Sequence, residues 1–234
     1  MKKMLIGALI VAVFLAYSLP PYLTGGSRVP LDDQPSWYYA LLVGHIMLGS
    51  VAMLAGLIQL GRRWFARYHR IAGRVYVACA IPGALGAIAV GTVSPFGPVN
   101  AVSNVTLGTL TLLFTGLGVR AILRGDVPSH RRWMLRSATL MYSVIINRIL
   151  APVLAITIGA LGIDGPLGDT LVTGLTAWLS WMIALGLCEW WIRRTPRRRR
   201  PAATGSGRRD AARKAKNPLR TRSERVPLGG GGGI

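Results

Sequence analysis

The chain has 234 residues, of which 51% are hydrophobic and 15% are charged, and its formal net charge is +20. This combination excludes a single water-soluble globule, in which about a quarter of the residues are charged. The charge is uneven, because residues 193–234 hold 14 Lys and Arg against two acidic residues. Cys79 and Cys188 lie inside apolar runs, so the sequence has neither a disulfide framework nor a CxxC metal motif. The composition indicates an apolar body with a basic tail.

Six apolar stretches follow one another along residues 1–192, at about residues 4–18, 37–60, 74–93, 102–121, 137–158 and 170–192. About 20 helical residues cross the roughly 30 Å of hydrocarbon in a bilayer. A helix also satisfies its own backbone hydrogen bonds, as lipid requires. The sequence therefore predicts an all-α fold, a multi-pass transmembrane helical bundle of six spans.

The first stretch has two interpretations. Lys2 and Lys3 precede a run of about fifteen apolar residues, which is also the pattern of a secretory signal peptide. The segment after this run, residues 18–23, lacks a clear small-x-small cleavage pattern. We therefore expect the first stretch to be retained as a membrane anchor.

Basic residues in the short connections predict the orientation of the bundle. Five arginines lie in residues 61–74 and five in residues 120–136, namely Arg62, Arg63, Arg67, Arg70, Arg74, Arg120, Arg124, Arg131, Arg132 and Arg136. The other connections hold only Arg28 against four aspartates. Because basic loops stay in the cytoplasm, both termini are expected there.

The tail, residues 193–234, is rich in Arg, Pro, Gly and Ser and contains no aromatic residue. Such a composition cannot bury a core, so we expect the tail to be disordered. It directly follows the last span, where anionic lipid headgroups attract each basic residue by about 1 kcal/mol. The expected partner of the tail is the lipid surface, and no nucleic acid is required.

Glycines recur within two of the spans. Gly44, Gly49 and Gly56 lie in the second span beside His45, and a similar series follows Pro82 in the third span, at Gly83, Gly86 and Gly91. Small residues allow neighbouring helices to approach closely. We expect these faces to pack at the centre of the bundle.

Four motifs carry a resemblance to a known family. Two His-Arg segments open the third and fifth spans, residues 68–76 and 129–134, and they accompany Gly44-His45-x-x-x-Gly49 and the segment Arg148–Pro152. In order and spacing the chain resembles the bacterial predicted membrane proteins catalogued as domain of unknown function family 2306, over residues 37–158. The resemblance implies a multi-pass protein of the bacterial cytoplasmic (inner) membrane and supplies no reaction. The tail lies outside it.

The two His-Arg segments have two interpretations. Their basic residues are expected to contact lipid headgroups or another anion, and they are His69, Arg70, Arg74, His130, Arg131 and Arg132. Alternatively, His69 and His130 are the axial ligands of a single b-type haem. Three histidines in the chain exclude two bis-histidine haems.

Other functional patterns are few. The chain has no nucleophile elbow, phosphate-binding loop or HExxH zinc motif, so enzymatic activity stays open. Glu189, near the end of the sixth span, is expected to pair with Arg193 and Arg194 on the same helix.

His45 and Arg148 are the most exceptional residues within the spans. His45 is expected about 12 Å below the outer surface of the membrane and Arg148 about 16 Å above the inner surface. In a hydrocarbon core of about 30 Å, the two residues lie at nearly the same depth. An arginine there costs roughly 2.5 to 3.5 kcal/mol, and Pro152 leaves the carbonyl of Arg148 without its helical donor. One alternative is that carbonyls, Asn147 and water satisfy Arg148.

The other alternative is a binding site: His45, Asn147 and Arg148 line a pocket for an anionic or carbonyl-bearing ligand. The sequence thus predicts an integral membrane protein of unassigned activity that binds a small ligand. A single-haem electron-transfer protein and a ligand-free scaffold remain as alternatives.

Overall fold

The computed structural model describes residues 2–61 and 66–194, and the chain divides into a unit of residues 1–194 and a second unit of residues 195–234. The expected disorder of the tail and the predicted roles of Arg62 and Arg63 lie outside the described residues. All regular structure in the described residues is helical: α1 Lys2–Ser18, α2 Pro20–Leu23, α3 Tyr38–Leu60, a 3-10 turn Ala66–Tyr68, α4 His69–Thr92, α5 Pro98–Leu123, α6 Val127–Ala160 and α7 Gly165–Arg194. The expected all-α class holds for these residues.

Five of these helices, α3 to α7, are long and apolar enough to cross a membrane. The helix α1 has 17 residues, about 25 Å, and is shorter than a full crossing. Each of the six apolar stretches is a helix, but the structure supports only five of them as spans, and the first stretch, α1, is not among these.

The helix α6 begins ten residues earlier than expected from hydropathy, at Val127. The Asp126 side chain caps it by accepting a 3.0 Å hydrogen bond from the Ser129 backbone, and Pro128 stands in its first turn. At 34 residues, or about 51 Å, α6 is longer than the hydrocarbon core, so part of it extends beyond.

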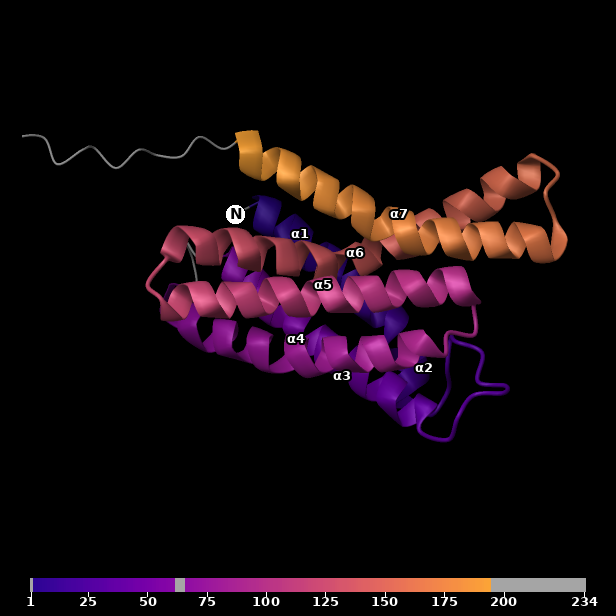
Figure 1. Cartoon of the computed structure of the whole chain (residues 1–234), viewed down its shortest axis with the longest axis horizontal. Coiled ribbons are helices and arrows are strands. Elements are labelled where there is room, and N and C mark those ends of the chain that lie inside the picture. Colours follow the sequence, from indigo (N-terminus) through magenta and orange to yellow (C-terminus); the bar gives the residue numbers. More distant parts are fainter. Residues whose placement is uncertain (1, 62–65, 195–234) are drawn as a thin grey trace, which may run out of the picture. The chain divides into compact units, whose positions relative to one another are not determined.

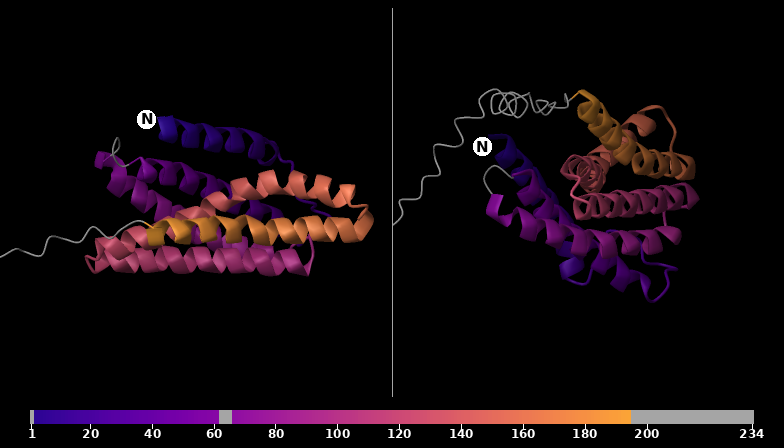
Figure 2. Two further views of the ribbon diagram at one scale, coloured as in Figure 1. Left: turned by 90° about the horizontal axis from the view of Figure 1, so that it is seen from above. Right: turned by 60° about the vertical axis from the view of Figure 1, so that its left-hand side comes forward.

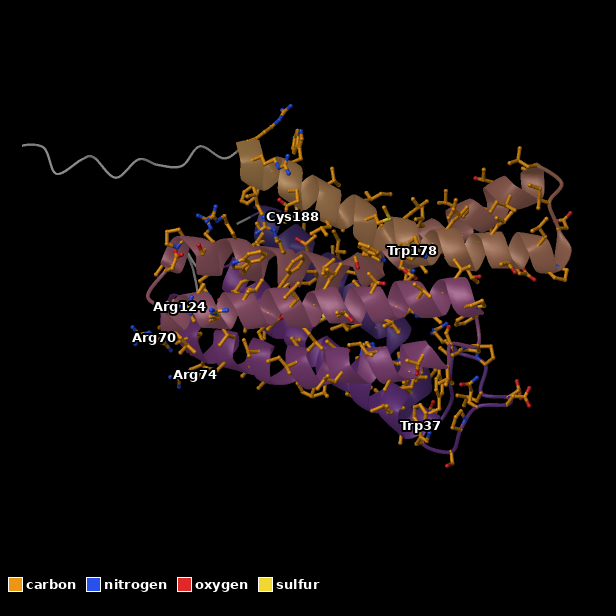
Figure 3. The ribbon with its side chains drawn as sticks, in the orientation of Figure 1. Trp37, Arg70, Arg74, Arg124, Trp178 and Cys188 are labelled. Carbon is orange, nitrogen blue, oxygen red and sulfur yellow. The ribbon has the colours of Figure 1, made fainter. Side chains whose placement is uncertain are left out.

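Neighbouring helices pack in chain order, as Figure 1 shows: α3 against α4, α4 against α5, α5 against α6, and α6 against α7. The helix α1 lies beside α3 (Figure 2), and α3 meets α6 over a short stretch. Arg70, Arg74 and Arg124 lie at one end of the bundle and Trp37 at the other (Figure 3). We call these the arginine end and the Trp37 end.

Toward the arginine end the helices are held by buried polar contacts. The hydroxyl of Ser137 on α6 is hydrogen-bonded to Tyr76 of α4 and to Thr115 of α5, each at 2.7 Å. All three side chains are at most 1% exposed. Beside them, Tyr76 packs with small residues of α3 and α4, which are Ala52, Ala55 and Ala80. Hydroxyls that satisfy one another thus join three helices without an unpaired polar group.

An ion pair joins α6 to α7 in the same half. Arg136 and Glu189 form a two-pronged contact, one bond of which is 3.0 Å, and their side chains are 17% and 31% exposed. The ring of Trp133 lies against Arg136, 4.7 Å from its guanidinium carbon. The direct partner of Glu189 is therefore Arg136 of α6, whose guanidinium takes both carboxylate oxygens, and not the expected Arg193 and Arg194 of its own helix. Arg193 acts on Glu189 only through a longer-range electrostatic attraction.

The glycines divide into two groups. A Cβ atom at Gly56 would lie 2.7 Å from the Tyr142 hydroxyl, and one at Gly86 would lie 3.2 Å from the Cβ of His45. Similar close contacts occur at Gly83 and Gly91. At Gly44 and Gly49, however, a Cβ would meet no atom within 4 Å. Gly56, Gly83, Gly86 and Gly91 therefore stand at close contacts between helices, whereas a side chain at Gly44 or Gly49 would begin in open space.

Candidate ligand cavity in the Trp37 half of the bundle

The helices surround a partly open cavity of about 310 Å³. It is lined by the last turn of α1, by α3 from Tyr38 to Met53, and by the central or Trp37-end parts of α4, α5 and α6. Ser180 of α7 and short segments beside these helices complete the lining. Its lining is mostly apolar and includes Gly49, which explains why a Cβ there meets open space. His45, Asn147 and Arg148 all line this cavity. The three residues selected from the sequence thus lie around one volume.

His45 is oriented by α4. Its Nδ1 lies 2.7 Å from the carbonyl oxygen of Gly83. A carbonyl can only accept a hydrogen bond, so Nδ1 carries the proton, and in a neutral imidazole Nε2 is then the acceptor. Gly86 allows this approach, because any larger residue would press on the Cβ of His45. The ring therefore keeps one unused acceptor.

Asn147 joins α6 to α7, since its amide nitrogen lies 3.4 Å from the carbonyl oxygen of Thr176. Its side chain still borders the cavity. One alternative expected Asn147 to hydrogen-bond the Arg148 side chain. The structure differs, because the Asn147 amide donates to α7 instead.

Arg148 is exposed on α6, next to Ile149, which is 63% exposed. No hydrogen bond or ion pair joins its guanidinium to the rest of residues 2–61 and 66–194. Among the described residues that line the cavity it is also the one charged side chain. A positive charge thus lies at the edge of an apolar volume with nothing in the described bundle to neutralise it.

Ser18 is a lining residue that sequence reasoning missed. It ends α1 and is 7% exposed, and its hydroxyl has no hydrogen-bond partner in the described part of the chain. Helical serines usually bond to the carbonyl four residues earlier, as Ser50 does to Ile46 at 2.7 Å. A serine at the end of a weak apolar run carries no signal of its own. Its significance comes from the space that it faces.

The two His-Arg segments lie elsewhere, and none of their six selected residues lines the cavity. Arg70 and Arg74 follow His69 in the first turns of α4, at the arginine end (Figure 3). In the first turns of α6, His130 Nδ1 lies 2.8 Å from the Gly118 carbonyl oxygen.

Beside His130 in the sequence, Arg131 is exposed and Arg132 donates to the Ser129 hydroxyl at 3.2 Å. Headgroup contact and haem ligation at these positions both stay predictions. No cluster of three or more His, Cys, Asp or Glu suited to a metal occurs within the described ranges.

Comparison with known proteins gives a family. Neither a curated protein nor a solved structure matches the chain. The model of a family described as predicted membrane protein (DUF2306) matches residues 42–192, which is more than half of the chain and includes His45, Asn147 and Arg148. The match extends further toward the C-terminus than the resemblance over residues 37–158. The chain therefore belongs to this family of predicted membrane proteins.

Proposed function

We propose that this protein binds an anionic or carbonyl-bearing ligand within the membrane, at the cavity that His45, Asn147 and Arg148 line. One observation carries the proposal: Arg148 is a charged residue of the described lining that has no partner in the described bundle. A cation at this depth normally turns to a partner inside the protein. A ligand that supplies an anion or a carbonyl oxygen would be that partner.

The chemistry of the three side chains suits such a ligand. A guanidinium presents a planar fork of donors that matches a carboxylate or phosphate, and such charge-assisted bonds are about twice as strong as neutral ones. The unused Nε2 of His45 would accept a hydrogen bond from an acid or hydroxyl group of the ligand. Binding would also offset the roughly 2.5 to 3.5 kcal/mol that an arginine costs at the centre of a span.

A copurification experiment tests the proposal. The protein, extracted in mild detergent, is examined by mass spectrometry for bound species, beside the variants Arg148→Lys and His45→Ala. Arg148→Lys keeps the charge but loses the fork, so it should insert normally and lose the bound species, and His45→Ala should retain less of it.

Arg120→Lys is the matched control, because Arg120 is exposed on α5 and lies outside the cavity lining. If both site variants retain the same species as the parent, the residues are structural and the proposal is wrong.

For the orientation, we propose six spans with α1 retained, both termini in the cytoplasm of a bacterium and the tail against anionic headgroups. The support is the gathering of Arg70, Arg74 and Arg124 at one end of the bundle. A reporter that is active only outside the cytoplasm should be silent after Arg124 and active after Gly165. Activity after Arg124 would reverse the orientation.

A further inference from the structure

We propose that the occupant of the cavity is an amphiphile drawn from the surrounding bilayer, with one anionic head and one long apolar chain, and that Ser18 of α1 helps to position its head. This inference rests on the proposed function, to which it adds the class of ligand and a role for α1.

The charge of the lining favours an anionic head. The described residues around the cavity include no aspartate, glutamate or lysine, so the charge of Arg148 is uncompensated there. A neutral ligand would leave this charge unpaired in an apolar volume, whereas one negative group would neutralise it.

The dimensions of the cavity favour a chain. It follows α3 from Tyr38 to Met53, a rise of about 22 Å, while its volume is only about 310 Å³. A long and mostly apolar volume can hold one extended hydrocarbon chain. A small anion would fill only the part near Arg148 and leave the apolar remainder empty.

Ser18 supplies the second polar observation. Its hydroxyl is buried, lines the cavity and donates to no atom of the described bundle. An anionic oxygen in the cavity would accept that hydrogen bond, which would be charge-assisted. Arg148 and Ile149 are exposed on α6. This side of the cavity would therefore face the bilayer, and the ligand would enter from lipid.

The test uses the full chain in nanodiscs of zwitterionic lipid with tritiated hexadecyl phosphate as the probe. Butyl phosphate and hexadecanol compete with it, since each lacks one feature of the probe. Each methylene favours transfer from water to an apolar environment by about fourfold. Counted against its total concentration, butyl phosphate should therefore bind more than about a hundredfold more weakly, because its short chain leaves most of it in water. Hexadecanol should bind at least about tenfold more weakly, because it lacks the charge.

Three variants sharpen the test. Arg148→Gln should lower the affinity for the probe to that for hexadecanol, and Ser18→Ala should weaken binding of the probe by about three- to tenfold. Gly49→Leu should abolish binding, because its side chain would occupy open space in the cavity. The control is Thr106→Ala, which removes an exposed hydroxyl bonded within α5 to Val102 at 2.7 Å and should change nothing.

The outcomes separate the two proposals. If butyl phosphate binds as tightly as the probe and still depends on Arg148, the amphiphile inference falls and the proposed function stands. If hexadecanol binds as tightly as the probe, or Ser18→Ala behaves as Thr106→Ala does, the inference is wrong. The proposed function fails separately, when Arg148→Lys and His45→Ala keep the copurified species.

Discussion

The two halves of this bundle are built from the same helices but differ in how their polar groups are used. Toward the arginine end, Ser137 joins three helices and Arg136 joins α6 to Glu189 of α7. Toward the Trp37 end, the helices surround a cavity where Ser18 and Arg148 have no partner in the described structure. The difference indicates that one half stabilises the fold and the other is available for binding.

The largest effect is expected from a pair of glycines seven residues apart on α3. Gly56→Leu should destabilise the protein by about 2–3 kcal/mol, because the new side chain would displace the Tyr142 hydroxyl from the Met53 carbonyl, its partner at 2.7 Å. Gly49→Leu enters open space and should leave the stability unchanged or slightly higher. Thermal unfolding in detergent measures both. An equal loss of stability would erase the contrast between the halves.

Two arginines of α6 give the next comparison. Arg136→Gln leaves the partly buried carboxylate of Glu189 without its fork and should cost about 2 kcal/mol, less than for a fully buried pair because both side chains retain some exposure. Arg148→Gln removes a charge that has no partner in the described bundle, so the fold should not lose stability. The same unfolding assay compares them. Greater destabilisation by Arg148→Gln would show that Arg148 is a structural residue.

A smaller effect is expected at the buried hydroxyls. Tyr76→Phe removes one hydrogen bond from Ser137, which keeps its bond to Thr115, so the loss should be about 1 kcal/mol. Ser18→Ala, which breaks no hydrogen bond of the described structure, should leave the stability of the ligand-free protein unchanged. If Ser18→Ala destabilised the ligand-free protein as much as Tyr76→Phe does, the Ser18 hydroxyl would have a structural partner.

Much of the fold follows from hydropathy, because lipid demands long apolar helices. Each of the six stretches is a helix, yet hydropathy missed the start of α6, where polar residues continue the helix beyond the apolar run. Sequence spacing also predicted that Glu189 pairs with arginines of its own helix. A contact with Arg136, 53 residues away in the chain, depends on which faces of α6 and α7 meet.

In the candidate site, too, the sequence identified some residues and missed others. His45 and Arg148 stand out in the sequence because titratable residues are rare within spans, and both line the cavity. Ser18 and Gly49 carry no such signal, since small residues are ordinary in membrane helices. Their places on the lining depend on where the packed helices leave space, which no local pattern encodes.

A structure of the protein in a lipid bilayer, determined beside that of Arg148→Gln, tests the central claim most directly. The proposals predict one elongated density along α3 in the parent, with its polar end at the guanidinium of Arg148, and loss of that density in the variant. A collapsed cavity with Arg148 paired to the protein's own groups, or an unchanged density in Arg148→Gln, would contradict them.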